Sequence, residues 1–314
     1  MTFETQNHAR AETIQAVMSI CLANTLNESQ IRRLLEHEDA PEAIIGSSTK
    51  QLAQAVMIDL KTAERLLQRI EEDDVRLGVF REMEQLQRNE IRMYTLKDEG
   101  YPIHLRSSYE APPYVYIWGC YSPQFLDAVS ILGSSDCSRY GSQQALRVAK
   151  ACAEAGWSVV TGGEVGVDRL ALEAGLEAGG RVIAALGAGI FGHGRQHHDL
   201  YERIVSSGQG CVISSVPTQT PPLSSNQVTG DLLTTGLSKA LCVIEASEKS
   251  GSLIAVRAME NIWRRPVFAL PGPIDSLRSI GTNQLIYRGR AKPVISTDRF
   301  IADMSEYRMP IQPH

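Results

Sequence analysis

The chain has 314 residues, a length that at roughly 100 to 200 residues per domain corresponds to about two domains. Hydrophobic residues make up 43% and charged residues 21%, a composition that is typical of a globular protein and excludes a disordered one. No apolar run reaches the roughly 18 residues of a membrane span, and the polar N-terminal sequence lacks the apolar segment of a signal peptide. We therefore expect a cytoplasmic protein that does not enter membranes.

The net charge of −5 is distributed unevenly along the chain. Residues 1–118 hold 13 lysines and arginines against 19 aspartates and glutamates, whereas the remaining residues hold 18 against 17. Neither part is basic enough for a surface that binds nucleic acid over its whole area. Any binding of nucleic acid is therefore expected at a local patch.

The first part of the chain is predicted to be helical. Apolar residues recur there at spacings of three and four, and Asn27 and Asp59 precede two of the periodic segments as plausible N-caps. A connector rich in proline and tyrosine follows, in which Pro112 and Pro113 exclude a helix. We place the domain boundary there, so that residues 1–118 form a small helical domain with its connector.

After the connector, short apolar runs rich in β-branched residues alternate with helical segments. Strands that are apolar on both faces and alternate with helices indicate a mainly parallel sheet that is covered on both sides. Residues 119–303 are therefore predicted to form an α/β domain with a doubly wound, Rossmann-like sheet, followed by a tail at 304–314. The predicted strands span residues 128–133, 157–162, 181–187, 211–215, 240–246, 266–272 and 292–296.

Glycine and hydroxyl residues collect where these predicted strands end. The carboxyl ends of parallel strands meet at one edge of a sheet, where backbone amides and helix N-termini can receive phosphate oxygens. A single turn of this kind most often only permits a tight bend, but five such turns at one edge favour a phosphate-binding pocket. Neutral donors from Thr161, Ser250, Ser252 and Asn283 are expected to line it. The predicted ligand-binding or phosphate-binding residues are Gly133, Ser134, Ser135, Thr161, Gly162, Gly163, Gly166, Ser250, Gly251, Ser252, Thr282 and Asn283.

A group of cationic residues near the C-terminus forms a possible DNA-binding patch. Some of them follow helix ends, where a positive charge complements the helix dipole, so a purely structural role explains part of the group. Trp263, Tyr287 and Phe191 are the candidates for stacking on bases, although aromatic residues are more often buried. The possible DNA-binding residues are Arg257, Arg264, Arg265, Arg288, Arg290 and Lys292, with Arg278 nearby.

Histidines and cysteines give little indication of a metal site. His193 and His197 could share one helix face and bind a metal ion, but Gly192 and Gly194 make that helix doubtful. A solvated loop is the better prediction for this segment. The six cysteines are scattered without a Cys-x-x-Cys pair, so we expect reduced, mostly buried thiols. No metal and no cofactor are predicted.

Two carboxylates near strand ends, Asp168 and Glu245, could act as an acid and a base. A structural role, in which Asp168 caps or braces a turn, is the better prediction. The sequence contains neither a nucleophile elbow nor a Walker loop, which leaves hydrolase and nucleotidase activities without support. We therefore assign no catalytic residue and expect a protein that is not an enzyme.

Several motifs, taken together, carry a family resemblance. They are Gly133-Ser134-Ser135 with Tyr140-Gly141, Thr161 to Asp168, Leu186 to Gly189, Val243 to Ala246, Ser250 to Ile254, Pro271-Gly272 and Gly281 to Ile286. In order and spacing this set resembles the DprA/Smf family of DNA-processing proteins, which have a Rossmann-like domain of the SLOG type. The resemblance extends from the helical region, expected to be SAM-like, to about Asp303, and we expect no winged helix after it.

The resemblance implies single-stranded DNA as ligand, a RecA-type recombinase as possible partner, and a homodimer. The sequence departs from the family motifs where they carry charge, because Ser135, Val165 and the segment Gly230 to Leu232 replace arginines. Each lost phosphate contact reduces the counterion release that drives binding, so weak DNA binding is expected.

Three hypotheses of function follow from these observations. The first is a DprA-like, non-catalytic protein that binds single-stranded DNA. The second is a binding module or sensor for a nucleotide-derived small molecule, because the glycines of the pocket are retained while the arginines are lost. The third is an enzyme of the nucleotide phosphoribohydrolase type, which ranks last because the Pro-Gly-Gly-x-Gly-Thr signature of such enzymes is missing.

Overall fold

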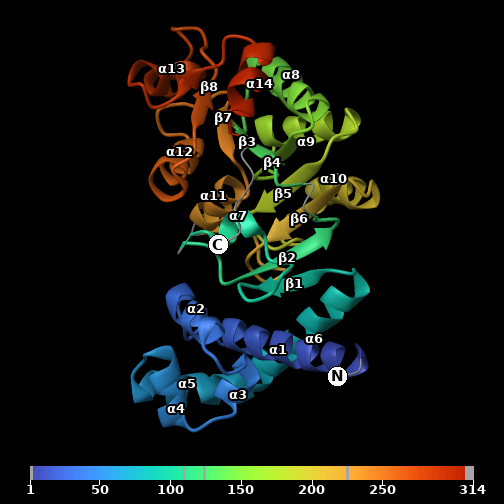
Figure 1. The fold of residues 1–314 in the computed structure, drawn as a ribbon, viewed down its shortest axis with the longest axis vertical. Helices are drawn as coiled ribbons and strands as arrows, with labels where there is room; N and C mark the ends of the chain where they lie inside the picture. Colours follow the sequence, from blue (N-terminus) through green and yellow to red (C-terminus); the bar gives the residue numbers. More distant parts are fainter. Residues whose placement is uncertain (1–2, 109, 123–124, 224–225, 308–314) are drawn as a thin grey trace. The chain divides into compact units, whose positions relative to one another are not determined.

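A computed structural model describes residues 3–108, 110–122, 125–223 and 226–307 (Figure 1). The chain divides into two compact units, the first comprising Met1–Tyr101 with Pro112–Tyr116 and the second Pro102–Ala111 with Ile117–His314. Separate folding of a helical domain that ends near residue 118 stays a prediction. Of the predicted C-terminal tail, residues 308–314 lie outside the described residues.

Helices make up most of the first unit. Both predicted N-caps are confirmed, since the side chain of Asn27 accepts a hydrogen bond from the backbone N–H of Gln30 and that of Asp59 accepts one from Thr62. A short strand, β1 (Arg92–Thr95), was not expected from the sequence. The helices are α1 (Phe3–Ala23), α2 (Glu28–Glu36), α3 (Pro41–Ile45), α4 (Thr49–Val56), α5 (Leu60–Glu71) and α6 (Asp73–Arg88).

The predicted α/β fold with a mainly parallel sheet is confirmed. The strands of the sheet are ordered β1-β2-β6-β5-β4-β3-β7-β8-β9, and the pairs from β6 to β9 are parallel. All residues of β3 to β8 are buried, which explains their apolar sequences. Beyond β1 the strands are β2 (Tyr114–Gly119), β3 (Ala128–Leu132), β4 (Ser158–Thr161), β5 (Val182–Leu186), β6 (Gly210–Ser214), β7 (Ala240–Val243), β8 (Val267–Ala269) and β9 (Lys292–Pro293).

The sheet is wound in two directions from its centre. From β3 the chain proceeds through β4 and β5 to β6, and it then returns to place β7 on the other side of β3. Helices α8, α9 and α10 cover one face of the sheet and α11, α12 and α13 cover the other (Figure 1). The point where the winding reverses therefore lies between β3 and β7, and this is the usual place for a ligand in such a fold.

The helices of the second unit agree broadly with the predicted segments. Three features were not foreseen. They are a short helix at Ile103–Arg106 in the connector, where no helix was expected, a π-helical turn, Met259–Trp263, that continues α12, and the last helix, α14. The α-helices are α7 (Ile103–Arg106), α8 (Arg139–Glu154), α9 (Val167–Glu177), α10 (Arg195–Ser206), α11 (Gln227–Gly236), α12 (Ser252–Ala258), α13 (Ile280–Tyr287) and α14 (Thr297–Ser305).

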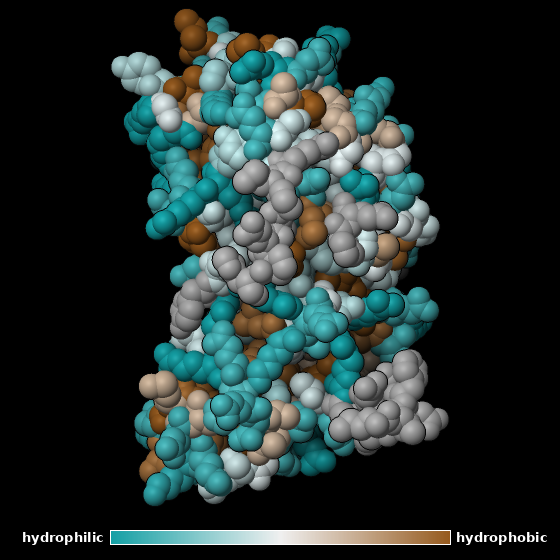
Figure 2. Space-filling model, viewed as in Figure 1, coloured by the Kyte–Doolittle hydropathy of each residue, from teal (hydrophilic) through white to brown (hydrophobic). Residues whose placement is uncertain are grey.

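Hydrophilic residues predominate on the face drawn in Figure 2, and hydrophobic residues are interspersed among them. Among the described residues, no helix combines the length and the hydropathy that crossing a bilayer requires. The cysteines are free thiols, and Cys152, Cys211 and Cys242 are buried.

The capping box at α2 provides a test of the first unit. Replacing Asn27 by alanine removes the acceptor for the Gln30 N–H, and this change is expected to lower the free energy of unfolding of this unit by about 1 kcal/mol. Urea unfolding followed by circular dichroism measures the effect. Asn27→Ser keeps a capping oxygen and serves as the control, so equal destabilisation by both variants would contradict a capping role.

Candidate ligand pocket at the switch point of the sheet

A pocket of about 310 Å³ opens at the carboxyl ends of the central strands. Its walls come from the loops that follow β3, β4, β5 and β7 and from one side of α11. The volume lies at the lower end of the range typical of small-molecule sites. The residues that line the pocket are Leu132, Gly133, Ser134, Ser135, Gly162, Glu164, Val165, Asp168, Ala185, Gly187, Gly230, Asp231, Thr234, Ser247, Ser250, Gly251 and Ser252.

The structure brings together two of the predicted loop segments and part of a third. The loop Gly133 to Ser135, Gly162, and the loop Ser250 to Ser252 line the pocket. The hydroxyl oxygens of Ser250 and Ser252 lie 2.8 Å apart, so the two side chains form one hydrogen-bonded pair at the start of α12.

The other predicted residues do not line this pocket, namely Thr161, Gly163, Gly166, Thr282 and Asn283. The Thr161 hydroxyl is fully buried and accepts a hydrogen bond of 3.1 Å from the Gly163 N–H. The Asn283 amide is held by the backbone N–H and C=O of Gly272, each at 3.1 Å. These neutral donors therefore stabilise turns of the protein itself.

Gly166 shapes the pocket from behind. Its φ of +82° favours glycine, and a Cβ there would lie 2.5 Å from the carbonyl oxygens of Ser134 and Ser135. Only a residue without a side chain lets the loop after β4 pack closely against the loop after β3. Gly166 thus influences the pocket indirectly, because it allows Ser134 and Ser135 to take their positions in the pocket wall.

Three carboxylates, those of Glu164, Asp168 and Asp231, also line the pocket, and sequence reasoning did not assign any of them to a binding site. Asp168 accepts a 2.9 Å hydrogen bond from the Gly162 N–H, so the predicted bracing role is confirmed. Burial raises the pKa of Asp168 well above its usual value, and the charges of Glu164 and Asp231 act in the same direction. Burial also raises the pKa of Asp231 to about 7.

A phosphate site usually contains positively charged side chains, whereas the ionisable side chains of this pocket are acidic. Carboxylates stand in its walls, and none of its lining residues is a lysine or an arginine. Only backbone amides, hydroxyls and protonated carboxyl groups can donate hydrogen bonds there. Such a lining opposes an anion by charge wherever its carboxyl groups are ionised, and it offers acceptors to N–H groups.

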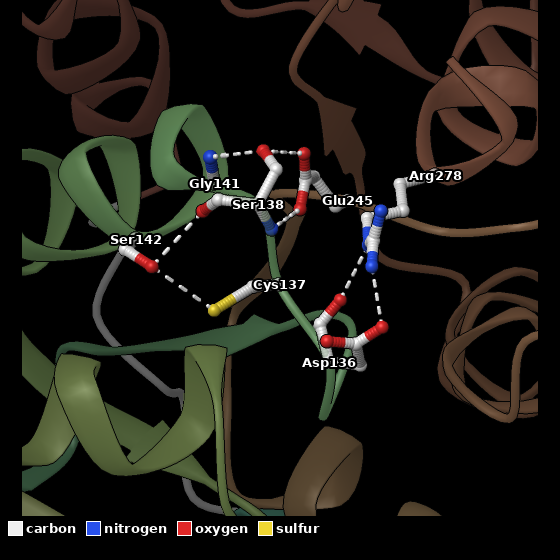
Figure 3. A network of polar contacts seen from close by, with 7 residues as sticks. All are labelled: Asp136, Cys137, Ser138, Gly141, Ser142, Glu245 and Arg278. Carbon is white, nitrogen blue, oxygen red and sulfur yellow. Dashed lines mark hydrogen bonds and ion pairs between the residues drawn. The ribbon is translucent and has the colours of Figure 1, made fainter.

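A network beside the pocket explains the second predicted acid–base candidate, Glu245 (Figure 3). Its carboxylate is almost fully buried and accepts hydrogen bonds from the Ser138 N–H at 2.9 Å and the Ser138 hydroxyl at 2.6 Å. Ser138 in turn caps α8 by accepting a bond from the Gly141 N–H. A Cβ at Gly141 would overlap the Glu245 carboxylate. Glu245 is thus a structural residue that holds the N-terminus of α8.

The same network extends to neighbouring loops. Arg278 binds both the carboxylate and the backbone carbonyl of Asp136, as Figure 3 shows. The Tyr140 hydroxyl donates to the Pro271 carbonyl at 2.9 Å. The motif residues around the pocket therefore connect α8 to the loops after β3 and β8.

The predicted basic patch includes several residues that are engaged within the protein. The Arg265 guanidinium donates to the carbonyls of Gly236 and Ser238 at the end of α11, and burial lowers its pKa to about 10. Arg290 is paired with Glu260. Arg265 is thus primarily a structural residue.

The remaining cations of the patch are exposed. The Lys292 ammonium lies 6.0 Å from the centre of the Phe268 ring and donates to the Tyr307 hydroxyl. Arg257, Arg264 and Arg288 have no ion pair among the described residues. Of the predicted stacking aromatics, Tyr287 is 90% exposed, whereas Trp263 is buried and donates to the Thr235 hydroxyl.

The prediction of a solvated loop for the histidines was wrong for His193 and His197. His193, before α10, and His197, in its first turn, are both buried. The error arose because a loop with glycines was assumed to lie in solvent. His198 is more exposed and stacks on the Trp118 ring at a centroid distance of 5.7 Å.

Comparison with known proteins places this geometry in a family. A model of the family of DNA recombination-mediator protein A matches residues 92–305, which is most of the chain. The chain belongs to this family. Protein Smf of Synechocystis is 30% identical to it over 73% of this chain but 58% of the relative, so the chain spans little more than half of that relative's length.

Two solved structures of DprA proteins resemble the chain. DprA of Streptococcus pneumoniae matches with a TM-score of 0.75 and 25% identity, covering 92% of this chain and 97% of its own. DprA of Helicobacter pylori, which was described for its single-stranded DNA binding mode, matches with a TM-score of 0.59 and 25% identity over 68% of this chain and 96% of its own. The family assignment and the fold thus support each other.

Within this family, the positions expected to carry arginine can now be located. Ser135 and Val165 both line the pocket, and Val165 is 44% exposed. Leu232 does not line it, although its neighbour Asp231 does. Gly230, at another of these positions, also lines the pocket. The departures from the family motif therefore leave Ser135, Val165 and Gly230 at the pocket without a positive charge, and Asp231 adds a carboxyl group.

The half-buried carboxyl of Asp231 predicts a pH dependence of stability. Its pKa is near 7 in the folded state and about 3.9 in an unfolded chain, so the native state holds the proton more tightly. The contribution of this group to stability is present below about pH 4 and is lost as the pH rises towards 7 and beyond. Asp231→Asn is expected to be more stable than the wild type at pH 8.5, by up to about 4 kcal/mol, and equally stable below pH 4.

Urea unfolding of both proteins across this pH range measures the difference. Asp275→Asn, a change at an exposed carboxylate, is the matched control and should bring no comparable gain. A difference between wild type and Asp231→Asn that does not vary with pH would contradict the assignment.

Proposed function

We propose that this chain binds single-stranded DNA as a non-catalytic recombination mediator, with the switch-point pocket as the place where the strand is held. The observation that carries the proposal is the pocket itself, which lies between the loops after β3 and β7 in a chain of the DNA recombination-mediator protein A family. The Helicobacter pylori relative, described as binding single-stranded DNA, supports the choice of ligand.

The chemistry of the pocket indicates how a strand would be bound. Backbone N–H groups of the loop Gly133 to Ser135 and the hydroxyl pair of Ser250 and Ser252 would donate to a phosphodiester. Glu164 and Asp231 would oppose it by charge, and Ser135 and Val165 add no cation. We therefore expect a low affinity and a shallow dependence on salt, since few counterions are released.

Two partners belong to this proposal as well. A RecA-type recombinase and a second copy of the chain remain predictions that the family resemblance suggests. They are not needed for the strand to enter the pocket.

A second candidate function is the binding of a nucleotide-derived small molecule. Asp168 and Asp231, with their raised pKa values, favour it, because carboxyl groups in a small pocket accept hydrogen bonds from the N–H groups of a nucleobase. This candidate predicts that a mononucleotide competes fully with an oligonucleotide for the pocket.

A salt series of oligonucleotide binding tests the first candidate. Fluorescence anisotropy with a labelled single strand should give weak binding for the wild type and a shallow slope of log K against log salt concentration. Introducing arginine at Ser135 and Val165 together should tighten binding and steepen the slope by roughly 1.4, at about 0.7 per phosphate contact. Tight wild-type binding with a steep slope would contradict the proposal that the pocket binds with neutral groups.

A second experiment tests whether the pocket is the site. Gly251 has φ of −56°, and a Cβ there would meet no atom within 4 Å, so the backbone tolerates a side chain. Gly251→Phe should block the pocket and abolish binding, whereas Gly251→Ala serves as the control and should retain it. Equal binding by both variants, with unchanged thermal unfolding, would place the strand elsewhere.

A further inference from the structure

A second group of side chains lies beside the pocket, at the ends of the next strands of the sheet. Glu164 comes from the loop after β4, while His193 and His197 come from the loop after β5 and the start of α10. One ligand atom from each of the three side chains lies within 4.8 Å of the other two. The ligand atoms of two imidazoles and one carboxylate thus lie close enough together for one metal ion to be considered between them.

His193 supplies the observation that points to a ligand. Its side chain is only 4% exposed, and its Nε2 atom is buried without a hydrogen-bond partner among the described residues. The nearest charged atom is Oε1 of Glu164 at 3.9 Å, which is beyond hydrogen-bonding distance. Leaving a buried ring nitrogen without a partner costs free energy, so a missing partner is expected at this position.

The orientation of His197 is fixed from the other side of its ring. Its Nδ1 atom lies 3.2 Å from the carbonyl oxygen of Gly163, and the hydroxyl of Tyr201 donates to the same oxygen. Because a carbonyl only accepts, Nδ1 carries the proton and the lone pair resides on Nε2. Histidines that bind a metal ion through one ring nitrogen typically donate a hydrogen bond from the other ring nitrogen to a carbonyl or carboxylate, as the Nδ1 of His197 does here.

The distances suit a small metal ion after a modest adjustment. Donor atoms at 2.0–2.1 Å from a tetrahedral zinc ion are about 3.4 Å apart. Here His193 Nε2 and Glu164 Oε1 are 3.9 Å apart, and all three ligand atoms lie within 4.8 Å of one another, so they must approach each other to bind one ion. The Glu164 side chain is 56% exposed and can move towards the histidines, which the packing holds in place. Two imidazoles and one carboxylate leave one position for water.

We propose that Glu164, His193 and His197 form a binding site for a divalent transition-metal ion of the zinc class. The donor set of two nitrogens and one oxygen favours zinc over magnesium or calcium, which prefer oxygen ligands alone. This proposal does not require that the pocket binds DNA.

Calorimetric titration of the untagged chain of residues 1–314 with Zn²⁺ tests this proposal. We expect one equivalent of Zn²⁺ to bind. His193→Ala and His197→Ala should each weaken the affinity by more than about 100-fold, because mutation of a residue that only hydrogen-bonds to a metal ligand already lowers metal affinity by about 10-fold to 100-fold. His198→Ala is the matched control, since this histidine lies next to His197 on α10 but outside the cluster. It should bind zinc with unchanged affinity.

A further variant distinguishes the loss of a metal ligand from the loss of the folded structure. The exposed Glu164 side chain makes Glu164→Gln harmless to the core, and this change should also weaken Zn²⁺ binding while the thermal unfolding of the apoprotein stays as in the wild type. Titration with Co²⁺ gives an independent readout, because a tetrahedral site yields intense visible absorption bands that should disappear in His193→Ala. The proposal is overturned if wild type and His193→Ala bind zinc equally, or if His198→Ala loses as much affinity as His197→Ala.

Discussion

A buried carboxylate, that of Glu245 at the end of β7, determines how the centre of the sheet is joined to the helices. It accepts two hydrogen bonds from Ser138, the residue that caps α8. A negative charge at a helix N-terminus is favourable, because it faces the unpaired N–H groups of the first turn. The β3–α8 loop is thereby tied to β7, and these two strands flank the point where the winding reverses.

The pocket depends on this tie. The loops after β3 and β7 form opposite walls of the pocket. Two contacts hold the loop after β7 in position. Glu245 binds Ser138 of the β3–α8 loop, and the Ala246 carbonyl accepts a hydrogen bond of 2.8 Å from the Gly281 N–H. Tyr140 and Asn283 add bonds to the loop at Pro271 and Gly272. Motif residues that look like ligand contacts in the sequence therefore serve mainly to hold the pocket walls in position.

The sequence predicted the sheet well because each central strand is buried on both faces. The segment at 182–186, for example, is apolar throughout and lies between two other buried strands. The strand β1 was missed because its four residues alternate in burial and follow a long helix directly. The helix α14 has a capping serine, Ser296, but it lies in a segment that was interpreted as the end of the domain.

The site was harder to predict than the fold. Glycine-rich turns located the edge of the sheet correctly, yet they gave no information about which polar atoms face inward. Asn283 turns to Gly272, whereas Asp231, which lies between two positions where the family motif has arginine, faces the pocket. Burial of a carboxyl group or an imidazole depends on neighbours that are distant in sequence, as for His193 beside Glu164. Such proximity becomes visible only in three dimensions.

Glu164 belongs both to the wall of the pocket and to the histidine cluster. If both places bind ligands as proposed, this one carboxylate interacts electrostatically with each of them, and the two binding equilibria are linked. A cation next to the histidines offsets the repulsion that this carboxylate exerts on an anion in the pocket. By thermodynamic reciprocity, an anion in the pocket raises the affinity for the cation by the same factor. If the proposed anion and the proposed cation both bind, the position of this single side chain couples the occupancy of the two sites.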